Sequence, residues 1–560
     1  MQVPRAARWL VRGYSGFGII AAIGFVIASF SPGLLPRLWL LQGAISGVLA
    51  AIGYGLGALL HWAARRLARL LELHICVGAW QRRVLQGLLI LWVAASFAWS
   101  MVANIRSQAV TAQLLSLPPL SFPQWVGAFV VMSVVATLFI TLGRLLRLFY
   151  RGVHTRAAAL VPNLIAVAVG VVVVTAIAGL FTDLVLARGV LNAFSRAAAS
   201  ANAQHPDLPA PTSSMITGGP GSPYAWDSLG FEGQRFTALA TKAATISSVT
   251  GRPAEQPIRT YAALPHDGDL QQAAAHVVSE LHRTGAFDRK VLAVFTTTGT
   301  GWINEWSAQS LEFLSNGDCA IAAMQYSYLP SHVAFVADRQ SPVEAGRALF
   351  DAVYTEWAKL PQDRRPQLVV SGESLGAYGG NSAFSGVDDM LTRAEGGVWS
   401  GTPRFTANIG ELFATRLQGS PQISPVIDNG DHIRFVAGDR GLTTDYVGRP
   451  FEEWKAPRFV YIQHPSDPVV WWSPDLLFDQ PAWLQEPRGA DVNPTMHWLP
   501  VITFWQVTAD MAVGLSQSAG HGHKYYDEEV GAWAAVLGLD PAGDWQAYAD
   551  TIRSHINMVE

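Results

Sequence analysis

The sequence predicts two architectures in one chain, an N-terminal bundle of about five transmembrane helices and a C-terminal doubly wound, mostly parallel α/β sheet. Three observations support this prediction. Only 14% of the 560 residues are charged, against about 25% in ordinary soluble domains. The first 190 residues are mostly apolar and hold almost no acids. Beyond them, apolar runs of strand length alternate with helical patterns.

The predicted helical bundle rests on five stretches that are long and apolar enough to cross a bilayer, which takes about 20 residues per helix. These stretches are residues 14–34, 38–60, 85–103, 125–146 and 159–186. The first follows three arginines, as a signal peptide would, but no small-residue cleavage site comes after it. We therefore expect an uncleaved anchor. Because acids are nearly absent from the spans, a transport site is not expected, and a structural anchor is favoured, with a lipid-binding or lipid-delivering bundle as the alternative.

The arginines of the short loops orient the predicted bundle, because cytoplasmic loops carry an excess of basic residues. Basic residues gather in three segments, namely Arg5, Arg8 and Arg12, then Arg65, Arg66, Arg69, Arg82 and Arg83, then Arg147, Arg151 and Arg156. The two remaining loops offer only Arg37 and Arg106. With five spans, the three basic segments lie on one side of the membrane. This predicts a cytoplasmic N-terminus and an extracytoplasmic C-terminal domain.

Composition also sets the expected domain boundaries. We expect a transmembrane domain over residues 1–190, a linker or surface wrap rich in Ala, Ser, Pro and Gly over 191–255, and a globular domain over 256–560. Strand candidates in the last region are Pro257–Leu264, Lys290–Thr298, residues 320–329, Gln367–Ser371, residues 432–438 and residues 458–465. Helical spacing covers residues 270–284 and 342–359. This alternation is typical of a parallel sheet.

Charge and cysteine content exclude several classes of function. A net charge of −3 gives no reason to expect a nucleic acid partner. Cys76 and Cys319 fall in different predicted domains, so a disulfide framework is not expected, and neither lies in a metal-ligand spacing. We expect no metal, no cofactor and no nucleic acid partner.

A nucleophile elbow is predicted directly after the strand Gln367–Ser371. The residues Gly372-Glu373-Ser374-Leu375-Gly376 form a G-x-S-x-G motif, and the small-residue start of a helix follows. In this strand–turn–helix context the motif is typical of the α/β-hydrolase fold, with Ser374 as nucleophile. Both glycines are required because side chains there would collide with neighbouring backbone. The helix directs its first N–H groups toward the position where an oxyanion would develop.

The serine needs a base, and the base needs an orienting acid, in the chain order Ser, Asp, His. Asp467 lies directly beyond the strand at 458–465 and is the favoured acid, with Asp439 after the preceding strand as the alternative. His521 and His523 precede the final helical region, and either residue can supply the base. We lean to His523 because it adjoins the helix expected near Asp527. His464 and His497 are interpreted as structural polar residues.

Two backbone donors are expected to form the oxyanion hole. One is the N–H of Leu375, the residue after the nucleophile. The other comes from the loop after an early strand, where Gly299 and Gly301 allow close approach to a ligand, and Thr300 is our candidate. The side chains of Trp302, Trp306, Trp471 and Trp472 flank this region as core residues or as an acyl-chain pocket.

Several motifs together resemble a family of bacterial membrane proteins, common in actinobacteria, that joins a multi-span N-terminal domain to an α/β-hydrolase catalytic domain. The motifs are AWDSLGFEGQRF, PIRTYAAL, RTGAFDR, TTTGTGW, GDCAIAAMQYSYLPS, RPQLVVSGESLGAYG, YIQHPSDPVVWW and GHGHKYY. The resemblance runs over nearly the whole chain. It implies a bacterial plasma-membrane protein with the nucleophile, acid and base on Ser374, Asp467 and the pair His521 and His523.

The expected function is hydrolysis of a carboxylic ester without metal, at the extracytoplasmic face of the membrane. A site tethered to the bilayer favours lipid or cell-envelope esters as substrates. An acyltransferase would use the same acyl-enzyme and pass the acyl group to an alcohol, and no residue in the sequence separates the two. A non-catalytic transport or signalling protein would predict a damaged triad, which the sequence does not show.

Overall fold

The computed structural model describes residues 14–72, 78–181, 196, 199–330, 333–335, 338–438 and 441–556. The chain divides into two compact units, a helical unit and a sheet unit. The helical unit contains Met1–Asn192, Pro474–Leu484 and Asp491–Val513. The sheet unit contains Ala193–Ser473, Gln485–Ala490 and Gly514–Glu560. Two segments from the expected globular domain at 256–560 therefore cluster with the N-terminal helices instead.

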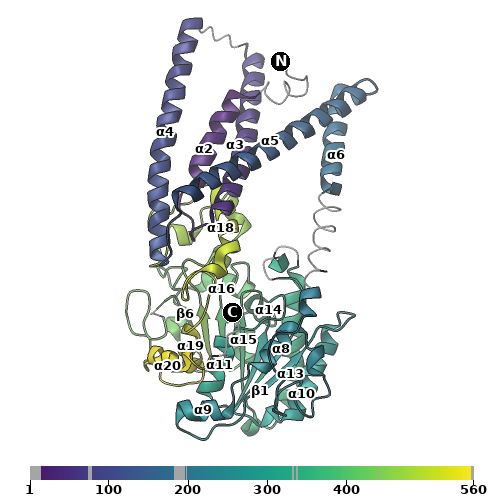
Figure 1. The fold of residues 1–560 in the computed structure, drawn as a ribbon, viewed down its shortest axis with the longest axis vertical. Coiled ribbons are helices and arrows are strands. Elements are labelled where there is room, and N and C mark those ends of the chain that lie inside the picture. The colour runs from purple at the N-terminus through teal and green to yellow at the C-terminus, as the bar shows by residue number, and fades with distance from the viewer. Residues whose placement is uncertain are drawn as a thin grey trace. The chain divides into compact units, whose positions relative to one another are not determined.

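The helical unit is built from long apolar helices and one short inserted helix (Figure 1). They are α2 (Gly16–Ser29), α3 (Trp39–Leu70), α4 (Ala79–Leu114), α5 (Phe122–Ala158), α6 (Asn163–Phe181) and α18 (Ile502–Asp510). Among the described residues, α3, α4 and α5 are long and apolar enough to cross a membrane, whereas α2 and the apolar stretch Asn163–Ile177 are shorter. Three spans are thus supported, and the expected five are not.

Glycines bring α3 and α5 into close contact. A Cβ atom at Gly43 would lie 2.5 Å from the carbonyl oxygen of Ala128, and one at Gly47 would lie 2.6 Å from Cβ of Val135. Small residues at such crossings are typical of helices that pack in a bilayer, where close backbone approach maximises van der Waals contact.

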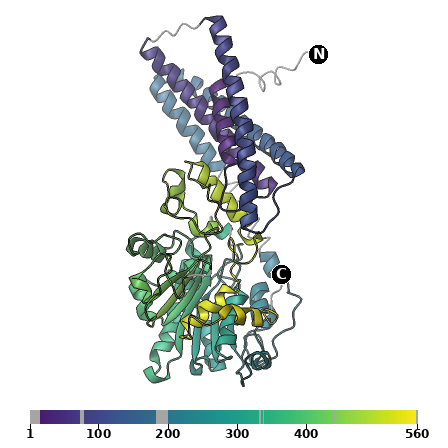
Figure 2. The same ribbon diagram turned by 90° about the vertical axis from the view of Figure 1, so that its left-hand side faces the viewer.

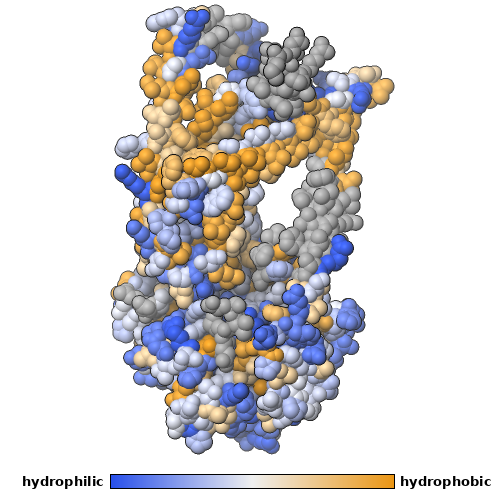
Figure 3. All heavy atoms as spheres, in the orientation of Figure 1, coloured by the Kyte–Doolittle hydropathy of each residue, from blue (hydrophilic) through white to orange (hydrophobic). Residues whose placement is uncertain are grey.

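Large apolar side chains cover the outer surface of these helices. Trp99 and Phe122 are each 80% exposed, and Figure 3 shows hydrophobic residues along much of this unit, whereas the sheet unit presents a more hydrophilic surface. An exposed apolar surface of this extent is unfavourable in water, and a lipid bilayer would cover it.

A buried ion pair holds the inserted segment to the helices. The carboxylate of Asp510 accepts hydrogen bonds from Nε of Arg37 at 2.6 Å and from the backbone N–H of Leu34 at 2.9 Å. Ile502 of α18 packs with Ile45 and Leu49 of α3. This apolar and ionic packing is the physical reason that residues 491–513 belong to the helical unit, which a strand–helix pattern does not reveal.

The sheet unit contains seven parallel strands in the order β1-β3-β2-β4-β5-β7-β6 among the described residues. They are β1 (Ile258–Ala262), β2 (Val291–Thr296), β3 (Cys319–Met324), β4 (Gln367–Glu373), β5 (Gly396–Ser400), β6 (Ile433–Val436) and β7 (Arg458–Ile462). The parallel sheet predicted from the sequence is confirmed. Only β5 lacks a predicted counterpart.

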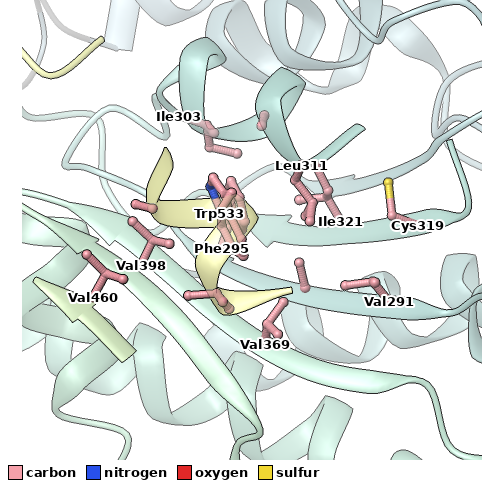
Figure 4. Packing of buried hydrophobic residues seen from close by; sticks show 14 of the residues in the cluster. Val291, Phe295, Ile303, Leu311, Cys319, Ile321, Val369, Val398, Val460 and Trp533 are labelled. Atoms are coloured by element: carbon pink, nitrogen blue, oxygen red, sulfur yellow. The ribbon is translucent and has the colours of Figure 1, made fainter. Parts of the chain in front are cut away.

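Helices cover both faces of this sheet (Figures 1 and 2). The longer ones are α8 (Gly230–Ala238), α9 (Ala243–Thr250), α10 (Leu270–Thr284), α11 (Glu305–Leu314), α13 (Gln340–Lys359), α16 (Ala407–Thr415), α19 (Glu528–Val536) and α20 (Trp545–Arg553). The short ones are α14 (Leu375–Asn381), α15 (Val387–Arg393) and α17 (Pro468–Trp471). Alternate strand residues meet α19 on one face, where Trp533 stacks on Phe295 with ring centroids 5.8 Å apart (Figure 4).

The segment expected to be a linker or surface wrap packs on the edge of the sheet. Thr217 donates its backbone N–H to the carbonyl of Arg259 in β1 at 3.0 Å, and its hydroxyl contacts Glu280 of α10. Helices α8 and α9 also come from this segment. It therefore contributes structure to the sheet unit.

We predict that Asp510→Ala destabilises the helical unit by about 3–5 kcal/mol, because the substitution leaves Arg37 buried without its partner. The measurement is thermal unfolding of the detergent-purified chain, followed by tryptophan fluorescence. Asp479→Ala, which removes an exposed carboxylate from a neighbouring segment of the same unit, is the matched control. Equal unfolding temperatures for the two variants would contradict this account of the ion pair.

Candidate active site

Ser374 occupies a strained turn between β4 and α14. Its backbone has φ of 57° and ψ of −122°, a conformation that L-residues rarely adopt. The turn is crowded, since a Cβ atom at Gly372 would lie 2.5 Å from the carbonyl carbon of Gly376. One at Gly376 would lie 2.3 Å from the carbonyl oxygen of Thr296. The glycines of the motif are therefore sterically required, as expected for a nucleophile elbow.

Asp467 follows β7 and caps the short helix α17. Its Oδ1 accepts the backbone N–H of Val469 at 2.8 Å, and its Oδ2 accepts both Nδ1 of His523 at 2.7 Å and the hydroxyl of Tyr525 at 2.6 Å. The carboxylate is fully buried. Four residues are thus joined through one side chain. The alternative acid, Asp439, lies outside the described residues.

Of the two histidine candidates, His523 is the one that the structure places at Asp467. Burial lowers the pKa of its imidazole, but the charge of Asp467 and the hydrogen bond to it outweigh burial, so the net pKa is raised. Gly401, at the end of β5, makes room for the ring, because a Cβ there would lie 2.6 Å from Cε1. His521 is half-buried and donates its backbone N–H to Ser518.

The hydrogen bond to Asp467 also selects the tautomer of His523. With the proton on Nδ1, the imidazole has its Nε2 lone pair available to accept a proton. Nε2 is buried and makes no hydrogen bond to any described residue, Ser374 included. In hydrolytic sites without substrate, the hydrogen bond between the serine and the histidine is often long, and it shortens when substrate binds.

The loop that carries His523 is anchored by a second histidine, His464. Its Nδ1 lies 2.8 Å from the carbonyl of Gly522 and its Nε2 lies 2.7 Å from Glu528. Burial lowers the pKa of His464, whereas the hydrogen bond and charge of Glu528 raise it more, to about 9. The protonated ring therefore donates from both nitrogens at neutral pH, and it stacks on Tyr525 at 4.2 Å.

Two buried carboxyl groups lie behind the nucleophile. Oε2 of Glu373 accepts Nδ2 of Asn304 at 2.6 Å, and Glu529 is hydrogen-bonded by the hydroxyl of Ser400. Both groups line a cavity of about 10 Å³, which is room for about one water molecule. Burial raises the pKa of Glu373 to about 7 and that of Glu529 to about 8. At pH 7 the carboxyl group of Glu529 therefore mostly holds its proton, whereas that of Glu373 is divided between its protonated and ionised forms.

The two oxyanion-hole candidates lie in different local settings. Leu375 is fully buried and begins α14, so its N–H belongs to the unpaired first turn of the helix. Thr300 lies in a turn that Gly301 closes by donating to the carbonyl of Thr298, and the carbonyl of Thr300 accepts Nε2 of Gln325. The assignment of Thr300 as a donor therefore stays a prediction.

Some residues of the site carry no signal in the sequence analysis. Tyr525 lies two residues beyond His523, and only the fold shows that its hydroxyl reaches Asp467. Glu529 is 129 positions from its partner Ser400. Of the four tryptophans near the site, Trp306, Trp471 and Trp472 are buried. Within the described residues, no group of three or more His, Cys, Asp or Glu side chains is arranged to hold a metal ion.

Comparison with known proteins gives two matches. Residues 258–551 match the family described as "Alpha/beta-hydrolase family", and residues 30–240 match "Alpha/beta-hydrolase family N-terminus". The first match covers the sheet, Ser374, Asp467 and both candidate histidines. No curated protein and no solved structure matches the sequence.

We predict that the stability of the sheet unit falls as pH rises from about 5 to about 8.5, and that Glu529→Gln reduces this fall. A carboxyl group whose pKa is raised by folding binds its proton more tightly in the native state, so its stabilisation is lost as pH rises through the native pKa, about 8 for Glu529. The expected difference is on the order of a few kcal/mol at the alkaline end.

The measurement for this prediction is the unfolding temperature as a function of pH. Glu344→Gln, which changes an exposed glutamate of α13, is the control and should keep the wild-type slope. An unchanged slope in Glu529→Gln would show that this carboxyl does not hold its proton in the native state.

Proposed function

The chain belongs to a family of α/β-hydrolases, and on that premise we propose that it is a membrane-anchored serine hydrolase that cleaves carboxylic esters. The observation that carries the proposal is the hydrogen bond from Nδ1 of His523 to the buried Oδ2 of Asp467. This pair lies at the carboxyl ends of the parallel strands, where Ser374 follows β4. A serine in a strained elbow next to a carboxylate–imidazole pair is the arrangement that activates a hydroxyl as a nucleophile.

The proposed reaction has two halves. In the first, Oγ of Ser374 attacks the ester carbonyl while Nε2 of His523 takes the hydroxyl proton and passes it to the leaving alcohol, which leaves an acyl-enzyme. In the second, His523 removes a proton from water as the water oxygen attacks the acyl-enzyme, and it then passes that proton to Oγ of Ser374 as the acyl bond breaks and the carboxylic acid leaves. Asp467 holds the imidazole and stabilises its positive charge. The N–H groups of Leu375 and Thr300 are proposed to bind the oxyanion.

The apolar helices favour a substrate that reaches the enzyme within the plane of the bilayer. The helical unit exposes an apolar surface, so we propose that the chain is integral to a bacterial plasma membrane and acts on lipid or cell-envelope esters. The arginine distribution supports a cytoplasmic N-terminus and an extracytoplasmic hydrolase unit.

We predict that Ser374→Ala and His523→Ala each lower kcat for p-nitrophenyl butyrate by about 10⁴–10⁶-fold, because nucleophile and base act as one unit. For the same reason, the double variant should lose almost nothing more. His521→Ala should lose far less than His523→Ala, since Asp467 is bonded to His523.

Ser382→Ala is the matched serine control for these measurements. Ser382 follows α14, and its hydroxyl bonds only to the carbonyl of Tyr378 among the described residues. This variant should keep activity. Full turnover in Ser374→Ala would remove the proposed mechanism, whereas an inactive His521→Ala beside an active His523→Ala would move the base to His521.

The proposed topology predicts the side of the membrane that each part of the chain reaches. A reporter fused after Glu560 should be active only in the extracytoplasmic compartment, and one fused near Ala64 only in the cytoplasm. Both fusions are to be measured with a paired enzyme reporter that functions on one side only. The opposite pattern would mean that an even number of spans separates the N-terminus from the hydrolase unit, or that the bundle is inverted.

A further inference from the structure

The guanidinium group of Arg339 lies among three aromatic rings. Its Cζ is 4.4 Å from the ring centroid of Phe405, 5.4 Å from that of Trp472 and 5.5 Å from that of Phe335. The rings also contact one another, with centroids 5.0 Å apart for Phe335 and Phe405 and 5.4 Å apart for Phe335 and Trp472. We call these four residues the aromatic enclosure. It fixes a cation and shields it partly from water.

Among the described residues, Nε is the one nitrogen of Arg339 that makes a hydrogen bond. Nε donates to the carbonyl of Phe335 at 3.0 Å, and within the described residues neither terminal nitrogen makes a hydrogen bond or an ion pair. The nearby carboxylate of Asp338 is used instead to cap the backbone N–H of Ser341. A half-buried guanidinium with two free amino groups attracts an anion, because its remaining hydration is incomplete.

Arg434 shows what a structural arginine looks like in the same unit. It too lies over two rings, those of Phe451 and Trp454. Its three nitrogens, however, all donate to backbone carbonyls. Packing on aromatic rings therefore does not by itself require free terminal nitrogens, and their availability in Arg339 calls for a separate explanation.

Three observations link the aromatic enclosure to the candidate active site. Tyr378, one helical turn after Ser374, packs edge-on against Phe405 at 5.0 Å. Trp472 directly follows the short helix that Asp467 caps. The loop of the oxyanion candidate also comes close, because a Cβ at Gly299 would lie 3.4 Å from Cβ of Ala334, the neighbour of Phe335.

We propose that Arg339 binds an anionic oxygen group, a carboxylate or a phosphate, that the ester substrate carries close to its scissile bond. This inference rests on the proposed serine-hydrolase function and names the substrate class for that same site. A planar guanidinium held at its Nε edge presents its two amino groups as a fork, which matches two oxygens of a carboxylate or phosphate. The substrate is thus an anionic ester, as an acidic lipid is.

The test compares two p-nitrophenyl esters with acyl chains of equal length, the neutral hexanoate and the adipate half-ester, which ends in a carboxylate. The quantity is the ratio of kcat/KM for the adipate to that for the hexanoate. We expect this ratio to fall about tenfold or more in Arg339→Gln, since a charge-assisted pair is lost. Arg339→Lys keeps the charge without the fork, so its ratio should fall between the two.

Arg365→Gln is the matched control. Arg365 also lies over a ring, that of Trp357, and donates to the backbone carbonyls of Leu360 and Ala358 at the other end of α13. Its substitution should leave the ratio within about twofold of wild type. In the wild-type chain the ratio should also decrease as NaCl rises from about 0.05 M to about 0.5 M, because salt screens the attraction. If Arg339→Gln fails to fold, the salt dependence of this ratio serves as the test of the proposal.

A second arm separates the two anions. Dihexanoyl phosphatidic acid should inhibit hexanoate turnover more strongly than dihexanoyl phosphatidylcholine does, and Arg339→Gln should remove the difference, if the group is a phosphate. Arginine dependence in either arm supports the proposal and identifies the anion. Normal hexanoate turnover with no arginine dependence in either arm would overturn it. No turnover of either ester by the wild-type chain would instead contradict the proposed function.

Discussion

The sheet unit depends on one tight turn, in which the chain leaves β4 at Glu373 and enters α14 at Leu375. Ser374 is held there with positive φ because two hydrogen bonds fix it from both sides. Its N–H donates to the carbonyl of Ser400 in β5 at 2.9 Å, and its carbonyl accepts the N–H of Tyr378 at 3.0 Å. A strained residue persists only where the surrounding structure determines it. The register between β4 and β5 therefore positions the nucleophile.

The remainder of the site places buried charged groups beside this turn. Asp467 is fully buried, and a buried carboxylate is tolerated only when its oxygens are hydrogen-bonded. A backbone N–H, a tyrosine hydroxyl and an imidazole N–H meet that requirement. The protonated His464 and Glu528 add a second charge pair that holds Gly522, the neighbour of His523. Support for the base is thus electrostatic as well as steric.

Much of the fold follows from local sequence patterns. Runs such as Val291–Thr296 are apolar because both faces of the strand are covered, and that pattern is readable without a structure. Strand β5 is not readable, because it begins with two glycines. A Cβ at either Gly396 or Gly397 would lie 2.6 Å from a carbonyl oxygen of a neighbouring strand. Close packing between the strands therefore requires glycine at these two positions, and glycine is a residue that sequence patterns assign to loops.

The residues of the site likewise fall into two groups, those that a local motif predicts and those that depend on distant contacts. The elbow around Ser374 is a contiguous motif, so the sequence predicts it, whereas the side chains that bond to Asp467 come from a segment more than fifty positions away. The adjoining helix is the only local reason to favour His523 over His521, and the structure adds that His523 is the ring that contacts the carboxylate of Asp467. The inserted segment 491–513 is likewise invisible locally, because its place is set by Arg37, more than 450 positions earlier.

The central claim is that Ser374 is the nucleophile of an acyl-transfer reaction. Its most direct test is to treat the full-length membrane protein with a fluorophosphonate, digest it, and locate the label by mass spectrometry of the peptides. The account predicts a single phosphonyl adduct, on the hydroxyl of Ser374, with loss of ester turnover in proportion to labelling. An adduct on another residue, or ester turnover that survives complete labelling of Ser374, would contradict it.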